Sequence, residues 1–444
     1  MWKMCNHRET EISLANARHW KPIVTHVRSN MDLRIAIDAQ LNPGSVGGTA
    51  TFLIGLIQAL ARLEGSEHYV IVGPWEDPDW LKPYTGPNQT IVRGPRREAM
   101  KSALAPVRPL INAGRRVSSW FSGSDAIWSR SARRSGFYET LECGVVHFPY
   151  QRFVASEIPT IFNPHDLQHV HYPQFFSEAD CKWREATYGT GCRMAHTVIV
   201  HSNFVKNDVV QHYNIASDKV QVILTPPPTQ VFAAPTAERL HSVKGEYKIG
   251  GEFVLYPAMT WQHKNHLRLL EALALLRDRG TKVDLVCTGR QTEFFPQIVQ
   301  KISALHLDAQ VRFLGMIPAE NLRALYRLAK CTILPTLFEG AGLPLVEAWA
   351  EGSPVTCSGV TSLGEIAADA ALVFDPQSVD SIANAIATML SDSQLRERLA
   401  SRGCERLKSF RWEDAAKAYR AVYRRAAGHA LTSEDKSILR SSRR

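Results

Sequence analysis

The sequence of 444 residues has no long hydrophobic run and no clustered cysteines. No stretch approaches the ~18 to 20 consecutive apolar residues that a transmembrane helix needs. The N-terminal residues lack an apolar signal core, so we expect no export. The eight cysteines are scattered without a C-x-x-C pair, which argues against a zinc site or a disulfide framework and favours the reducing cytoplasm.

Several nucleotide and metal motifs are also missing. Neither a Walker A motif nor G-x-G-x-x-G follows the first predicted strand, so the sequence does not support an ATPase or a dehydrogenase. Asp77 and Asp79 form a D-x-D pair that could ligate a metal, but Pro78 between them and the loop-like surroundings favour a solvated turn. We therefore predict no metal requirement.

The positive charge is concentrated in one segment. Of the formal net charge of +9, residues 93–134 carry +8, from ten Lys or Arg against Glu98 and Asp125. An anionic membrane surface or a phosphorylated acceptor would suit this segment, and nucleic acid is not expected. Its apolar spacing is partly helical, but Pro106 and Pro109 would break one long helix. An interfacial helix, a mobile basic loop and a solvated insertion all stay open.

The remaining sequence reads as repeated strand-helix units. With 45% apolar and 21% charged residues, it is typical of a globular enzyme, and its length predicts two domains. We predict strands at 33–38, 69–72, 145–149, 159–162 and 197–200, then at 253–257, 283–287, 311–314, 332–334, 355–358 and 371–374. This order predicts an α/β fold with two doubly wound parallel sheets and a ligand at the carboxyl ends of their strands.

One stretch, residues 334–351, carries the strongest chemical signal. A short apolar strand ends at Pro335, two glycines permit a tight turn, and a helix begins near Pro344. Such a helix offers free amides and the positive end of its dipole to a phosphate. Glu339 and Glu347 flank this site, which suggests a nucleotide-sugar. The alternative is an ordinary strand-loop-helix unit with two surface glutamates.

The spacing of Glu339 and Glu347 resembles the E-x7-E motif of retaining GT-B glycosyltransferases, in particular glycosyltransferase family 4 (glycosyl transferases group 1). The match continues through residues 334–336 and 352–355. The resemblance implies two Rossmann-like domains that face a cleft. It also implies the following division of the chain: a disordered extension at 1–30, an acceptor-side domain at 31–228 with the basic insertion 93–134, a linker at 229–252, a nucleotide-sugar domain at 253–411, and a terminal helix at 412–430 that crosses back.

The resemblance also implies roles for residues of the second half. Glu339 would hold the sugar hydroxyls and support the oxocarbenium-like centre, and Glu347 would accept hydrogen bonds from the ribose. Lys264 matches the family lysine that binds the donor diphosphate, together with amides around Gly342 and Leu343. The family usually has an arginine a few residues before this lysine, which is absent here; His263 and Arg268 are the candidates to replace it.

In the first half, the resemblance points to four residues. Gly47 and Gly48 match a glycine loop near the donor phosphate and the acceptor, with a plain tight turn as the alternative. His165, in a His-Asp pair after a strand, would reach the donor sugar; a lone histidine there is otherwise structural. Ser202 lies where it could approach phosphate, although an ordinary helix cap fits it better.

The implied function is the transfer of a hexose from a nucleoside-diphosphate sugar to a hydroxyl acceptor with retention of configuration. Similarity to bacterial surface-polysaccharide transferases suggests GDP-mannose as donor, and a glycan or lipid-linked acceptor such as a lipopolysaccharide core. We expect a cytoplasmic protein, peripheral on the inner face of the plasma membrane through residues 93–134. Two alternatives are a nucleotide-sugar epimerase of the GT-B type and a non-enzymatic protein that binds anionic ligands.

Overall fold

The computed structural model describes residues 32–41, 47–96, 136–228 and 232–441. The chain from Leu33 onward forms one compact unit. The predicted extension 1–30 and nearly all of the basic insertion, from residue 97 onward, lie outside the described residues. The predicted membrane contact of that insertion therefore stays a prediction.

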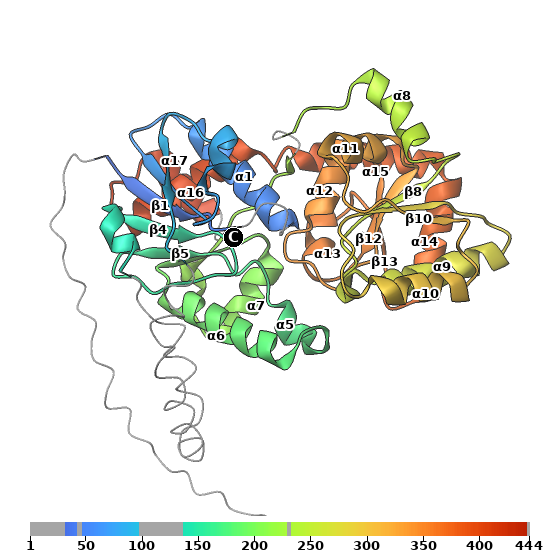
Figure 1. Cartoon of the computed structure of the whole chain (residues 1–444), viewed down its shortest axis with the longest axis horizontal. Helices are drawn as coiled ribbons and strands as arrows, with labels where there is room; N and C mark the ends of the chain where they lie inside the picture. The colour runs from blue at the N-terminus through green and yellow to red at the C-terminus, as the bar shows by residue number, and fades with distance from the viewer. Residues whose placement is uncertain (1–31, 42–46, 97–135, 229–231, 442–444) are drawn as a thin grey trace, which may run out of the picture. The chain divides into compact units, whose positions relative to one another are not determined.

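The first of two described sheets has seven parallel strands in the order β3-β2-β1-β4-β5-β6-β7 (Figure 1). Its strands are β1 (Arg34–Asp38), β2 (His68–Gly73), β3 (Gln89–Arg93), β4 (Val145–Phe148), β5 (Thr160–Phe162), β6 (Thr197–Val200) and β7 (Val220–Val222). The helices that accompany them are α1 (Gly47–Ala61), α5 (Gln168–His171), α6 (Glu178–Met194), α7 (Asn203–Tyr213), α16 (Trp412–Ala426) and α17 (Ser433–Ser441). Short 3₁₀ helices span Pro78–Tyr84, Tyr138–Leu141, Pro173–Phe175 and Ser217–Lys219.

The second sheet has six parallel strands in the order β10-β9-β8-β11-β12-β13. Its strands are β8 (Val254–Pro257), β9 (Leu285–Thr288), β10 (Val311–Phe313), β11 (Cys331–Leu334), β12 (Val355–Ser358) and β13 (Leu372–Phe374). Its helices are α8 (Ala237–Glu246), α9 (His266–Asp278), α10 (Phe295–Ala304), α11 (Ala319–Leu328), α12 (Leu343–Ala350), α13 (Thr361–Ala367), α14 (Val379–Ser391) and α15 (Ser393–Leu407). A 3₁₀ turn at Gln262–Lys264 precedes α9.

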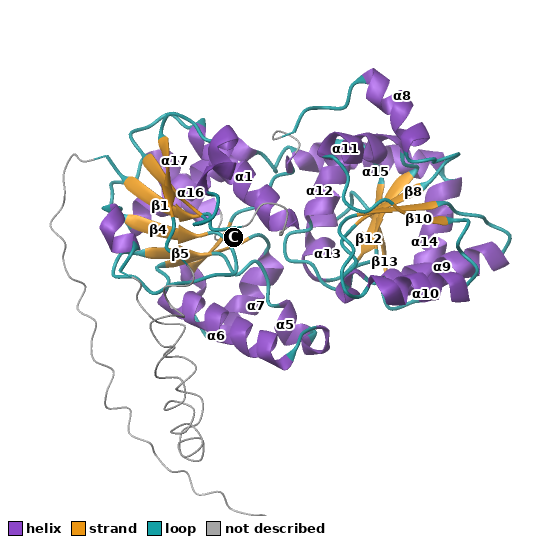
Figure 2. Cartoon of the chain, viewed as in Figure 1, coloured by secondary structure: helices purple, strands orange, loops and turns teal. Residues whose placement is uncertain are grey.

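Helices cover both faces of each sheet, as Figure 2 shows. Around the second sheet, α9, α10 and α14 lie on one face and α11, α12 and α15 on the other. The central strands are therefore buried along their whole length, as in β8 and β12, because a strand covered on both faces has no solvent side. This burial supplies the main stabilisation and fixes the strand ends from which the loops emerge.

Helix α16 lies far along the chain from the first sheet but packs on its helix α1. A Cβ added at Gly55 would lie 2.1 Å from the Trp412 ring, so the absence of a side chain lets the two helices approach closely. The indole Nε1 of Trp412 donates to the Pro227 carbonyl oxygen at 3.0 Å. Further along α16, the hydroxyl of Tyr423 forms a hydrogen bond of 2.8 Å with the ring nitrogen Nδ1 of His147. Helix α16 thus completes the core beside β1 and β4.

The predicted fold class, two doubly wound parallel sheets, is confirmed. Each predicted strand has a counterpart, whereas β3 and β7 were not predicted. The segment 229–252, predicted as a linker, contains α8, which packs on α11 beside the second sheet. The Asp77–Asp79 turn enters a 3₁₀ helix that has Asp77 at its N-cap position.

Candidate functional site

Lys264 and Glu339 meet at the carboxyl edge of the second sheet. Lys264 follows β8 and Glu339 follows β11, and these strands are neighbours in the sheet. The Lys264 Nζ forms an ion pair with the Glu339 carboxylate, and the two side chains are only 15% and 16% exposed. A cation and a carboxylate are therefore held together at the edge where ligands of doubly wound sheets bind.

The loops that carry these two residues are bonded to each other. The His263 carbonyl accepts hydrogen bonds from the Leu337 amide at 2.8 Å and from the Thr336 hydroxyl at 3.1 Å. The side-chain amide Nδ2 of Asn265 donates to the Pro335 carbonyl oxygen at 2.9 Å. Lys264 lies between His263 and Asn265, so its backbone is fixed to the turn that presents Glu339.

A third loop fixes Glu339 from the other side. At the start of α13, the Thr361 hydroxyl accepts a hydrogen bond from the Glu339 amide at 3.0 Å. The Ser362 hydroxyl donates to the Glu339 carbonyl at 2.7 Å. Because three consecutive strand ends hold one glutamate, its carboxylate is held in position before any ligand arrives.

Gly340 brings this turn against the loop after β5. A Cβ added at Gly340 would lie 2.6 Å from the His165 carbonyl oxygen and 3.0 Å from the Asp166 Cβ. Only glycine permits that approach. The Ser202 hydroxyl donates to the Gly340 carbonyl at 3.3 Å, and its oxygen also caps α7 by accepting from the Val205 amide. Ser202 thus has the capping role expected from its position, and its approach to phosphate stays a prediction.

His165 is a neutral group with a fixed tautomer. Its backbone has a left-handed φ of 67°, and its Nε2 lies 2.9 Å from the Pro149 carbonyl oxygen. A carbonyl can only accept, so Nε2 carries the proton and Nδ1 keeps a lone pair. Burial lowers the pKa of His165 to about 4, so it is uncharged at neutral pH. It can therefore accept a hydrogen bond from a ligand hydroxyl through Nδ1.

The N-terminus of α12 follows the Glu339 turn. Gly342 precedes the helix with φ 59°, a left-handed value that glycine adopts without strain. Among the described residues, the amides of Gly342 and Leu343 donate no hydrogen bond within the chain. Gly48, at the start of α1, faces this end: a Cβ there would lie 3.7 Å from the Leu343 side chain. Gly47 contacts Met259 in the loop after β8.

Glu347 lies about one turn inside α12, in a different environment. The Tyr326 hydroxyl of α11 donates to its Oε2 at 2.9 Å. In the part of the chain that the structure describes, no cation pairs with Glu347. Burial raises the pKa of Glu347 to about 7, and the nearby Glu351 carboxylate adds to this rise.

Of the two candidates for the missing family arginine, Arg268 carries a positive charge and His263 does not. Burial and the adjacent Lys264 hold the pKa of His263 well below its usual value, so it is neutral. The Arg268 guanidinium donates to Asn265 Oδ1 and to the Pro376 carbonyl, both at 3.3 Å.

Sequence reasoning missed Arg184 of α6. Burial raises the pKa of Asp166, and the positive charge of Arg184 opposes this rise; the same charge lowers the pKa of His263 further.

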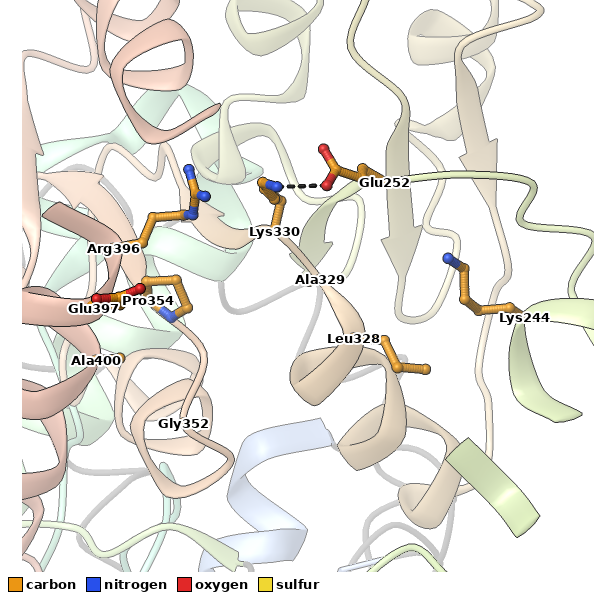
Figure 3. A pocket seen from close by; sticks show the side chains of 10 residues that line it. All are labelled: Lys244, Glu252, Leu328, Ala329, Lys330, Gly352, Pro354, Arg396, Glu397 and Ala400. Carbon is orange, nitrogen blue, oxygen red and sulfur yellow. Dashed lines mark hydrogen bonds and ion pairs between the residues drawn. The ribbon is translucent and has the colours of Figure 1, made fainter. Parts of the chain in front are cut away.

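A surface cavity of about 350 Å³ lies elsewhere (Figure 3). Its lining includes Glu252, Lys330 and Pro354, which precede β8, β11 and β12. Because these strands are parallel, the cavity is at their amino ends, opposite to the edge that carries Lys264 and Glu339. None of the predicted site residues lines it, and doubly wound folds bind ligands at the other edge.

The two doubly wound sheets with a glycine turn and helix N-terminus at the strand ends define a GT-B fold. Residues 241–406 match the family described as Glycosyl transferases group 1, and residues 46–228 match Glycosyltransferase Family 4. The chain therefore belongs to the family 4 glycosyltransferases. The structure of sucrose-phosphate synthase from Thermosynechococcus elongatus has the same fold, with a TM-score of 0.65 and 20% identity over 88% of this chain and 98% of that one.

Other similar proteins extend the comparison. The O-antigen chain mannosyltransferase B of Escherichia coli is 29% identical over 252 residues, which cover 56% of this chain and 66% of that protein. The serotype-specific mannosyltransferase WbdA of Escherichia coli is 29% identical over 50% of this chain, but the match spans only 28% of its length. Anabaena HepE, solved with UDP and glucose, gives a TM-score of 0.63 at 16% identity, with 88% of this chain and 99% of that one covered.

None of the helices in the described ranges is both long and apolar enough to cross a bilayer.

Proposed function

We propose that this chain transfers a hexosyl group from a nucleoside-diphosphate sugar to a hydroxyl of a glycan acceptor, with retention of anomeric configuration. Mannose is the proposed hexose, because the Escherichia coli relatives named above are mannosyltransferases. The name of the first relative, an O-antigen chain enzyme, supports assembly of a bacterial surface polysaccharide as the process.

The ion pair between Lys264 and Glu339 is the observation that carries this proposal. Breaking the bond between sugar and diphosphate leaves negative charge on the phosphate oxygens and positive charge on the sugar. An ammonium beside a carboxylate offers opposite charges to the two developing charges. The amides of Gly342 and Leu343 and the dipole of α12 would add to the stabilisation of the phosphates. No metal and no enzymatic nucleophile enter the proposed step.

Glu339 and His165 have complementary proposed roles at the sugar. The Glu339 carboxylate would accept hydrogen bonds from sugar hydroxyls and favour positive charge at the anomeric carbon. The neutral His165 would accept another through Nδ1, from the loop that Gly340 contacts. Two acceptors from different sheets would orient the sugar relative to the leaving diphosphate and the incoming hydroxyl.

The test is a turnover assay with GDP-mannose, UDP-glucose, UDP-galactose and UDP-N-acetylglucosamine. The intact protein should slowly release nucleotide from one donor, and both Glu339→Ala and Lys264→Ala should abolish that release. Conversion of a donor to another nucleotide-sugar without nucleotide release would instead identify an epimerase. Absence of turnover with every donor, or unchanged turnover in both variants, would contradict the proposed site.

A further inference from the structure

Glu347 has one hydrogen-bond partner among the described side chains, the phenol of Tyr326. Tyr326 belongs to α11 and is 1% exposed. Its hydroxyl donates to Glu347 Oε2 at 2.9 Å and lies 3.5 Å from the Pro344 carbonyl. Burial raises the pKa of Tyr326 well above its usual value, so the phenol stays protonated and remains a donor.

The cations near Glu347 are already engaged with another carboxylate. Arg323 and Arg327 of α11 each bind Glu351 through Nε at 2.6 Å, one turn further along α12. The Glu351 side chain is fully buried, and its negative charge disfavours ionisation of Glu347. Within the described structure, the Tyr326 hydrogen bond is therefore the one interaction that favours the charged form of Glu347.

The second oxygen of Glu347 is free for a ligand. Oε1 has no hydrogen-bond partner within the described residues, while Oε2 is bound to Tyr326. A carboxylate with one oxygen anchored cannot rotate freely, so the direction of the other oxygen is set by the phenol. Ribose offers two adjacent hydroxyls, which are donors of the right kind for such an oxygen.

We propose that Tyr326 is a positioning residue for nucleotide recognition: its hydroxyl fixes Glu347 so that Oε1 accepts a hydrogen bond from the ribose hydroxyls of a nucleoside diphosphate. This inference rests on the proposed function. Tyr326 would not touch the nucleotide itself. Its loss should weaken nucleotide binding in a way that depends on pH and on the ribose hydroxyls.

Calorimetric titration of the full chain with GDP, UDP, ADP and CDP between pH 6 and 9 provides the test. With the best-bound nucleotide, Tyr326→Phe should weaken binding about tenfold at pH 7, the order expected for a hydrogen bond to a charged group. The pH at which affinity reaches half its maximum should move upward, because the variant carboxyl loses a donor that stabilises its anion. The 2′,3′-dideoxy analogue should bind both proteins equally.

Two further variants separate positioning from general damage. Tyr247→Phe removes a phenol that also contacts α11, through Asn321 at 2.6 Å, but does not touch Glu347. This control should leave nucleotide affinity and its pH profile unchanged. In the Glu347→Ala background, Tyr326→Phe should cause no further loss, because the phenol then has no carboxylate to orient.

The outcomes distinguish this inference from the proposed function. If Tyr326→Phe weakens the dideoxy analogue as much as the natural nucleotide, or leaves the pH profile unmoved, the positioning role is wrong while nucleotide binding stands. If the intact protein binds none of the four nucleotides, the proposed function and the inference both fail.

Discussion

Glu339 and Glu347 belong to the same motif, eight residues apart, yet the structure gives them opposite surroundings. Glu339 lies in a turn, is paired with Lys264, and is held by loops from three strand ends. Glu347 lies inside α12, where no cation of the described residues pairs with it, and is bound by the phenol of Tyr326. The two carboxylates are chemically identical, but their different surroundings give them different charge partners and suit them to different functions.

The difference suggests that the two acids bind different parts of the donor, Glu339 the sugar and Glu347 the nucleotide. When sugar and diphosphate separate, the Glu339 carboxylate can stabilise the positive charge on the sugar and the neighbouring ammonium the negative charge on the phosphates. A buried carboxyl whose pKa is raised to about 7 is suited to hydrogen bonding, and its affinity for a ligand depends on its protonation. We therefore expect variants at Glu339 to affect the chemical step and variants at Glu347 to affect binding.

The largest effect is expected from Glu339→Gln. The side chain keeps its size but loses the charge that pairs with Lys264. Removal of one preorganised electrostatic group should lower kcat about 10² to 10³-fold. Donor KM should change little. Steady-state kinetics with the active donor check this expectation, and a change confined to KM would reverse the division of roles between the two acids.

The second largest effect is expected from Lys264→Met. It should lower kcat/KM about 10²-fold, because the diphosphate loses its cation. Lys264→Arg is the matched control, since it keeps the charge but changes its geometry. We expect the arginine variant to recover part of the activity. Equal activity of the methionine variant and the parent would mean that Lys264 does not face phosphate.

Gly340→Ala moves the Glu339 turn without altering either acid. The new Cβ would lie 2.6 Å from the His165 carbonyl oxygen, which is backbone and cannot rotate away. The overlap should cost about 1 to 3 kcal/mol of stability. Displacement of Glu339 should lower kcat about tenfold. Thermal unfolding and kinetics measure the two effects; Gly245→Ala, where no atom lies within 4 Å of the added Cβ, is a steric control for the kinetics.

The smallest effect is expected from Glu347→Gln, and it should appear mainly in the pH dependence. The pKa of Glu347 is raised to about 7, so the ionised fraction grows as the pH rises through that value. Nucleotide affinity of the parent should therefore be about tenfold weaker at pH 6 than at pH 8. Glu347→Gln should bind with a flat profile over this range. Titration at each pH checks the prediction, which a flat profile in the parent would contradict.

Much of the fold could be predicted from the sequence because buried parallel strands read as continuous apolar runs. The strand at 254–257 is of this kind. Strand β3 was missed because it has a polar Gln89 at its start and two exposed residues, Thr90 and Arg93. Helix α8 was missed because its polar sequence buries only Val243.

The site was predictable only where the residues are contiguous in a motif. Glu339, Gly342 and Glu347 came from one stretch, but the pairing of Lys264 with Glu339 spans 75 positions and depends on the strand order. Tyr326 gave no sequence signal, since a tyrosine on a helix is usually a core residue.

The most direct measurement compares the affinity of a nucleoside diphosphate with that of its sugar-bearing donor in the parent, Glu339→Gln and Glu347→Gln. The account predicts that Glu339→Gln binds the nucleoside diphosphate normally but loses the extra affinity that the sugar provides. Glu347→Gln should weaken both ligands by the same factor at pH 8. If Glu339→Gln impairs the bare nucleotide, or if Glu347→Gln affects only the sugar-bearing donor, the two acids do not divide the donor as proposed.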